Sequence, residues 1–161
     1  MSSDKMFISP IGIKLIKEFE SFRGEAYLDP AGIPTIGFGT TKIYGRKVAL
    51  GMVINEPVGD ILLAGDLQDV EDEVNSLVRF PMRQCQFDAL VSFEYNTGGL
   101  ASSSLLKVIN SQSPFVTENL FTMWNKARVN GQLLPLNGLT RRRRAEFALY
   151  VKDAKHEIRG L

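Results

Sequence analysis

Residues 17–41, KEFESFRGEAYLDPAGIPTIGFGTT, decide the fold that this sequence predicts. The stretch runs from the end of an expected helix into short β-prone pieces that Gly and Pro interrupt. Glu20, Asp29 and Thr35 stand in it with eight residues between the first two and five between the last two. Two carboxyl groups and a hydroxyl on a short scaffold suit general acid and base hydrolysis, above all of a glycosidic bond.

Helical periodicity over 10–22 distinguishes Glu20 from its neighbour Glu18. Ser9 and Pro10 suit the N-cap and the first position of a helix. One side of this helix collects the apolar residues Ile13, Leu15, Ile16, Phe19 and Phe22. Glu20 lies at the border of that side, whereas Glu18 lies on the polar side. Partial burial favours the protonated form of a carboxyl, so we expect Glu20 to be the acid.

The segment that follows the helix predicts a small sheet. Candidate strands cover 25–28, 35–38 and 43–44, with turns at 29–32, Gly39 and Gly45. A sheet of three short strands is too thin to stand alone and must rest on helices. Its first turn is expected to bring Asp29 and Thr35 onto adjacent strands, close enough to share one water.

The remainder of the chain predicts helices, which makes the fold class α+β. The expected helices cover 57–79, 83–96, 102–111, 116–129 and 139–157. We interpret the 161 residues as a single domain. Its expected parts are a sheet lobe at 24–56, a connecting helix at 57–79, and a helical lobe at 80–161 with helix 10–22 packed on it. A cleft between sheet and helical lobe is the expected place for an extended ligand.

Composition excludes several classes of function. A net charge of +1 provides no overall field for nucleic acid or an anionic membrane. One cysteine, Cys85, and one histidine, His156, argue against a metal site, and we expect no cofactor. We expect Cys85 to be a buried small side chain. The N-terminus MSSDKMFISP has no apolar core of a signal peptide, and no stretch is long enough to span a bilayer, so we expect a cytosolic protein.

Three segments resemble one family. Residues 19–40, FESFRGEAYLDPAGIPTIGFGT, resemble the catalytic segment of the phage-type lysozymes, the endolysins of glycoside hydrolase family 24. FDALVSFEYNTGGLASSSLL, at 87–106, is similar to the Asn-x-Gly junction of that family. NGLTRRRRAEFALY, at 137–150, is similar to its C-terminal Gly-Leu-x-x-Arg-Arg helix. The resemblance covers the whole chain and implies a lysozyme-like fold. One departure is Thr40, which stands where many members have a histidine.

The resemblance implies roles for the three residues of the opening stretch. Glu20 would protonate the departing glycosidic oxygen. Asp29 would lie across the scissile bond and either activate a water or stabilise positive charge, and Thr35 would position the water. The held water favours inversion over retention, although the separation of the carboxyls decides this and sequence does not supply it.

The resemblance also implies a role for Arg141, the first residue of the run Arg141–Arg144, as the arginine that pairs with Glu20. We expect the other three arginines to form salt bridges with acids such as Glu146, or to contact peptide carboxylates of the wall. A nucleic-acid patch is disfavoured because no aromatic residues interleave the run.

Two further groups are open to more than one interpretation. Tyr95 and Asn96 stand before the Gly98–Gly99 break, where Asn96 is either a sugar ligand or a helix C-cap. Trp124 could stack on a sugar, but its spacing from Leu120 and Phe121 favours the core.

The predicted function is that of an endolysin muramidase that hydrolyses the β-1,4 bond between N-acetylmuramic acid and N-acetylglucosamine in peptidoglycan. The alternatives are a lytic transglycosylase, which forms an anhydro sugar, and a non-enzymatic cationic protein that binds wall or membrane. The expected partner is the glycan strand, with no nucleic acid and no stable membrane insertion. By resemblance, we expect a monomer that stays in the host cytoplasm until a separate holin releases it to the wall.

Overall fold

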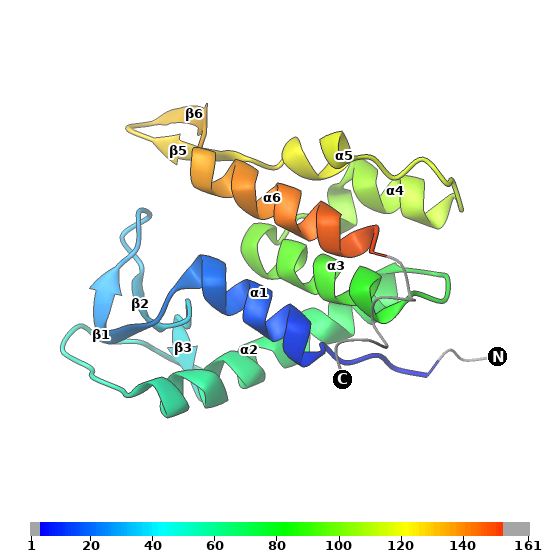
Figure 1. Cartoon of the computed structure of the whole chain (residues 1–161). Helices are drawn as coiled ribbons and strands as arrows, with labels where there is room; N and C mark the ends of the chain where they lie inside the picture. The colour runs from blue at the N-terminus through cyan, green and yellow to red at the C-terminus, as the bar shows by residue number, and fades with distance from the viewer. Residues whose placement is uncertain (1–3, 153–161) are drawn as a thin grey trace. The chain divides into compact units, whose positions relative to one another are not determined.

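The computed structural model describes residues 4–152, which form helices and short antiparallel hairpins (Figure 1). In chain order the elements are α1 (Pro10–Glu20), β1 (Arg23–Leu28), β2 (Pro34–Gly37), β3 (Lys42–Ile43), β4 (Arg46–Lys47), α2 (Glu56–Leu77), α3 (Gln84–Thr97), the 3-10 helix η1 (Leu100–Ser102), α4 (Ser104–Asn110), α5 (Glu118–Thr122), β5 (Lys126–Val129), β6 (Gln132–Pro135) and α6 (Asn137–Tyr150). They belong to two compact units, Lys14–Asp69 and Met1–Ile13 with Val70–Leu161. The predicted α+β class is confirmed.

The unit Lys14–Asp69 contains two hairpins where the sequence predicts one three-stranded sheet. β1 pairs with β2, and β3 pairs with β4, each as a separate two-stranded antiparallel sheet. The prediction of three strands in one sheet is therefore wrong. The physical reason is the chain reversal after β2, where Ile36 and Thr40 form a single bridge and the chain turns away.

A bulge in β1 lets this strand pair on two sides. Arg23 lies opposite Gly37 and Tyr27 lies opposite Thr35, so a step of four residues on β1 faces a step of two on β2. The residues between them pair instead with the segment at 52–54, through the bridge from Glu25 to Val53. Bulges re-aim side chains, and they occur often beside active sites.

Helix starts in both units follow from local capping, which the sequence predicts at Ser9 and Pro10. Pro10 takes the first position of α1, and the Ser9 carbonyl accepts the amide of Ile13. Asn55 Oδ1 accepts the amide of Val58 at 3.1 Å and caps α2. These short-range rules fix where α1 and α2 begin.

The unit that holds α3 to α6 is built around α3. Phe87, Leu90 and Phe93 of this helix are fully buried, and α3 packs along α6 (Figure 1). Phe121 of α5 meets the ring of Phe93 edge-on at 5.8 Å. Cys85 is buried as predicted, and its thiol donates to the Lys152 carbonyl.

One predicted helix is wrong. The chain expected to be helical over 116–129 forms α5 only as far as Thr122 and then the hairpin β5–β6. Asn130 and Gly131 both have positive φ, 49° and 81°, and they form the two-residue turn of that hairpin. An Asn-Gly pair between β-prone residues is a strong local hairpin signal, and the interpretation as a simple helix break missed it.

The last helix differs at both ends from the prediction of 139–157. It begins at Asn137 and ends at Tyr150, while 153–157 lies outside the described residues. No helix in the described part of the chain is both long and apolar enough to cross a membrane.

Candidate active site

Glu20 is the last residue of α1, and the chain leaves the helix immediately after it. Ser21 has a positive φ of 57°, and its amide donates to the Lys17 carbonyl, which ends the helix. Glu20 is half-buried and Glu18 is exposed, as the helical periodicity predicts. Glu20 thus stands at a fixed helix end that leads directly into β1.

Lys17 fixes the last turn of α1 to the beginning of α2. Its Nζ lies 2.7 Å from Asp60 Oδ1 and 3.6 Å from Glu56 Oε1, and 4.9 Å from the centre of the Phe38 ring. The hydrogen bond to Asp60 is the main cause that raises the pKa of Lys17. The ammonium therefore stays charged and helps to hold the helix end that carries Glu20.

Asp29 is tied into the turn between β1 and β2. Its Oδ1 accepts the amides of Ala31 and Ile33, each at 2.8 Å. The Asp29 amide in turn donates to the Ile33 carbonyl at 3.0 Å. Within 4–152, no hydrogen bond to Asp29 Oδ2 is found, so this oxygen can accept a proton.

Thr35 is anchored to the same residue, Ile33. It is 4% exposed, and its Oγ1 donates to the Ile33 carbonyl at 2.9 Å. Because the hydroxyl proton is committed to that carbonyl, the oxygen is left to accept a hydrogen bond. The sequence predicts Asp29 and Thr35 on adjacent strands; Thr35 does lie in β2, but Asp29 lies in the turn just after β1. Both side chains bond to the backbone of Ile33, Asp29 to its amide and Thr35 to its carbonyl.

Tyr27 also belongs to this group, although the sequence does not predict it as a site residue. It lies directly opposite Thr35 in the hairpin. Side chains that face each other in an antiparallel pair project from the same face. The guanidinium of Arg23 lies 4.2 Å from the centre of the Tyr27 ring. The available signal was the two-residue spacing from Tyr27 to Asp29, which is the period of a strand.

The predicted ligands Tyr95 and Asn96 lie at the end of α3, in the other unit. Asn96 is exposed and Tyr95 is half-buried. Gly98, with φ of 57°, is the residue that terminates the helix, and its amide donates to the Glu94 carbonyl. The interpretation of Asn96 as the C-cap is therefore wrong, because that role needs a left-handed residue and Gly98 supplies it. Its role in sugar binding stays a prediction.

The arginine run of α6 divides into outward and inward side chains. Arg142 is 3% exposed, and both Arg143 and Glu146 are 0% exposed. Arg143 Nε lies 2.8 Å from Glu146 Oε2, and Arg142 Nε lies 3.2 Å from Glu146 Oε1. Arg144 is exposed and pairs with Glu118 at 3.1 Å. The prediction that these three arginines form salt bridges is confirmed, with Glu146 as the buried acceptor.

Ser92 of α3 completes the buried cluster. Its Oγ donates to Glu146 Oε1 at 2.7 Å, and its carbonyl accepts from Arg142 Nη2 at 3.3 Å. Burial raises the pKa of Glu146, while the two guanidiniums and Ser92 oppose that shift. Arg141, the sequence-predicted partner of Glu20, is exposed at the start of the helix, and that pairing stays a prediction.

Trp124 packs inside its own unit, as its spacing predicts. Its ring meets Phe93 edge-on at 5.7 Å. A Cβ atom on Gly99 would lie 2.2 Å from this ring, so the indole covers the backbone at Gly99. The interpretation as core rather than sugar platform is supported.

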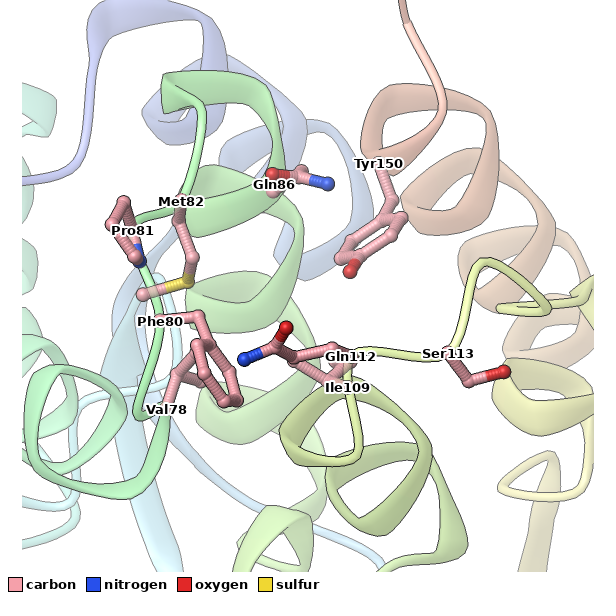
Figure 2. Close-up of a pocket in the computed structure, with 9 residues that line it drawn as sticks. All are labelled: Val78, Phe80, Pro81, Met82, Gln86, Ile109, Gln112, Ser113 and Tyr150. Carbon is pink, nitrogen blue, oxygen red and sulfur yellow. The ribbon is translucent and has the colours of Figure 1, made fainter.

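A cavity of about 260 Å³ lies in the unit that holds α3 to α6 (Figure 2). Its lining includes the apolar side chains Val78, Phe80 and Met82, the ring of Tyr150 and the amide of Gln112, which faces the cavity between them. None of the sequence-predicted site residues is among its lining residues. The described lining contains no carboxyl group, so this cavity does not supply an acid and base pair.

Comparison with known proteins shows consistent similarity over nearly the whole chain. Residues 17–146 match the family described as phage lysozyme. The endolysin of Salmonella phage P22 is 43% identical over 149 residues, which cover 91% of this chain and 99% of the relative. A solved endolysin from Escherichia coli O157:H7 phage FAHEc1 has a TM-score of 0.87 at 36% identity and covers 94% of this chain and 97% of its own. The muramidase domain of SpmX from Asticaccaulis excentricus has a TM-score of 0.81 at 34% identity, with coverages of 91% and 99%.

Proposed function

The chain belongs to the phage lysozyme family, and from that membership we propose that Glu20, Asp29 and Thr35 perform its catalysis. The chain is a peptidoglycan-hydrolysing muramidase that lyses the host cell. The bond that it hydrolyses is the β-1,4 linkage between N-acetylmuramic acid and N-acetylglucosamine. The observation that carries the residue assignment is that Asp29 and Thr35 both bond to Ile33, in the hairpin that directly follows the half-buried Glu20.

Glu20 is the general acid in this proposal. It donates its proton to the glycosidic oxygen while the bond from that oxygen to the anomeric carbon breaks. Its half-buried position at the end of α1 supports this role, because the helix end holds the carboxyl in a fixed place. The leaving sugar departs as an alcohol, and Glu20 is left ionised.

Asp29 and Thr35 hold and activate the attacking water. The water donates one hydrogen to Thr35 Oγ1, whose own proton is held by the Ile33 carbonyl. It donates the other to Asp29 Oδ2, because Oδ1 already accepts two amides. The oxygen lone pair then forms the new bond to the anomeric carbon, and the second proton passes to Asp29. Attack from the face opposite the leaving group inverts that carbon.

Tyr95, Asn96 and Arg141 bind the glycan strand in this proposal. The exposed amide of Asn96 matches an acetamido group, which offers one donor and one acceptor. The exposed guanidinium of Arg141 suits a peptide carboxylate of the wall. Replacing Asn96 with Ala is expected to raise KM more than it lowers kcat.

The decisive variant is Glu20→Gln, measured by release of reducing sugar from purified peptidoglycan. Loss of a general acid should lower the rate by about 10²- to 10⁴-fold. Glu18→Gln is the matched control, since it removes an exposed carboxyl two residues away on the same helix. If Glu20→Gln keeps wild-type activity, the assignment of the acid is wrong.

Product analysis separates hydrolysis from its closest alternative. A lytic transglycosylase would form an anhydro sugar without consuming water, which mass spectrometry distinguishes from a reducing end. Incubation in ¹⁸O-water should label the new reducing end. Proton NMR of the first product should show the α-anomer if the reaction inverts, and a first product in the β-form would contradict water attack from the Asp29 side.

A non-enzymatic cationic mechanism is disfavoured by the burial of Arg142 and Arg143, which removes two charges from the face of α6. Lysis that persists in Glu20→Gln would favour that alternative.

We also infer that the chain acts as a monomer without stable insertion into the membrane. Family membership supports its retention in the host cytoplasm until a separate holin gives it access to the wall. Co-expression with and without a holin, followed by turbidity, tests the release.

A further inference from the structure

Arg23 and Tyr27 form a stacked pair on β1 that the proposed catalysis leaves without a role. The guanidinium carbon of Arg23 lies 4.2 Å from the centre of the Tyr27 ring, within the range of a favourable cation–π contact. Between these two residues β1 carries a bulge, so that three residues of β1 lie opposite one residue of β2. The stack therefore depends on an irregularity of the strand rather than on ordinary pairing.

This pair stands among the three proposed catalytic residues, all within the unit Lys14–Asp69. Tyr27 faces Thr35 across the hairpin, and Asp29 follows Tyr27 by two residues at the end of the strand. Arg23 follows Glu20 by three residues, through the tight helix end at Ser21. Both ends of the stacked pair are thus tied by short chain segments to the two carboxyls.

The charges around the Tyr27 hydroxyl are those of the site itself. Burial is the main cause that raises the pKa of Tyr27; Arg23 lowers it, and Glu20 and Asp29 raise it. The phenol therefore stays neutral near neutral pH and keeps its proton as a hydrogen-bond donor. A neutral hydroxyl dipole orients its positive end toward nearby anions.

We propose that Arg23 and Tyr27 are a positioning pair, which holds one fixed positive charge and one neutral donor beside Glu20 and Asp29 and so sets the pH range of activity. The proposal rests on the roles proposed above, in which one carboxyl is protonated while the other is ionised. Among the described residues, the charged groups that act on the Tyr27 phenol are Arg23 on its own strand, Glu20 at the end of α1 and Asp29 in the turn. Thr35 is its uncharged neighbour from β2.

The pair has a definite expected effect on the pH profile. A positive charge and a hydroxyl donor favour the ionised form of nearby carboxyls, so removal of either one should shift the pH profile of activity to higher pH. The acid limb, which requires an ionised Asp29, and the alkaline limb, which requires a protonated Glu20, then move in the same direction. A shift of both limbs upward is the signature of this pair.

The test is the pH dependence of kcat/KM on purified peptidoglycan for Tyr27→Phe and Arg23→Gln. Each variant should move both limbs upward by about 0.3 to 0.7 pH unit, the range that partly solvated charge interactions produce. Tyr44→Phe and Arg46→Gln are the matched controls. Tyr44 is 98% exposed, and Arg46 is an exposed residue of β4 in the same unit. Because both side chains lie in solvent, neither substitution should shift the profile.

Three results would overturn the proposal. They are an unmoved profile in both test variants, equal shifts in the controls, or a folded Tyr27→Phe variant that is inactive at every pH. The last result would mean that the hydroxyl acts directly on substrate. Melting curves identify any variant whose fold is disturbed, and for such a variant Arg23→Lys, which keeps the charge, should preserve the wild-type profile. Glu20→Gln, measured in parallel, shows which of the two proposals fails. If this variant keeps full activity, the catalytic roles are wrong. If it loses activity while the Tyr27→Phe profile is unmoved, only the positioning pair is wrong.

Discussion

Thr40 shows how a single departure from the family pattern is accommodated. Where many members carry a histidine, Thr40 is almost fully buried and its Oγ1 donates to Asp66 Oδ2 at 2.6 Å. Burial raises the pKa of Asp66, and this hydrogen bond opposes the shift. Thr40 therefore supplies the half-buried Asp66 carboxyl with a neutral hydroxyl donor.

Replacing Thr40 with Val should destabilise the fold. The change keeps the volume but removes the donor, which leaves a half-buried carboxyl without its hydrogen bond. We expect a loss of about 1–3 kcal/mol in the free energy of unfolding at pH 7, measured by urea denaturation. Thr40→Ser keeps the hydroxyl and should retain most of the stability. Equal stability of the Val variant and the wild type would contradict this account.

At the scale of the element, α6 is organised by one buried acid rather than by its four consecutive arginines. Glu146 accepts from Arg142, Arg143 and Ser92, and the Arg143 guanidinium also lies 5.1 Å from the centre of the Phe93 ring. Only the outward residues of the run, Arg141 and Arg144, present charge to solvent. The helix thus locks to α3 through a polar cluster inside an otherwise apolar contact.

Glu146→Gln should be among the most damaging substitutions in α6. It removes the negative charge that two buried guanidiniums share, and breaking a buried pair costs about 3–5 kcal/mol. Arg144→Gln, which breaks an exposed pair on the same helix, should cost less than about 1 kcal/mol. Thermal unfolding monitored by circular dichroism compares the two. A cost for Glu146→Gln as small as that for Arg144→Gln would show that the cluster does not hold the helix.

Across the whole molecule, each compact unit contains a carboxyl whose pKa is raised by burial. Asp66 belongs to one unit and Glu94 to the other. Glu94 Oε2 accepts the Leu100 amide at 2.7 Å, which lowers its pKa, whereas neighbouring Glu73 raises it further. The folded chain therefore binds both protons more tightly than the unfolded chain does.

This linkage predicts the direction of a pH effect on stability. Unfolded carboxyls titrate near pH 4, so the stabilisation is complete below that value and is lost as pH rises through the folded pKa of each group. Glu94→Gln removes one titration. The wild type loses this stabilisation as pH rises and the variant does not. The free energy of unfolding of the variant minus that of the wild type should therefore increase from pH 4 to pH 7, measured by urea denaturation at each pH. Glu25→Gln, at an exposed carboxyl, should give a constant difference; a constant difference for Glu94→Gln as well would refute the prediction.

Much of the fold was predictable because its determinants are local. Pro10 and Asn55 mark helix starts, and Gly98 marks a helix end, through rules that act over three or four residues. The wrong prediction of a helix over 116–129 also concerns a local signal, because the Asn130–Gly131 pair indicates the hairpin. Helical periodicity correctly separated half-buried Glu20 from exposed Glu18.

The sequence by itself determined the family, the α+β class and the spacing of Glu20, Asp29 and Thr35, because these depend on neighbours along the chain. Only the tertiary structure decided that Arg142 and Arg143 turn inward to Glu146, and that Ser92, 54 residues away, completes their cluster. It alone placed Tyr27 opposite Thr35, through a bulge whose position depends on a second pairing with residues 52–54. Such contacts join segments that are far apart in the chain, and the periodicity within either segment does not encode them.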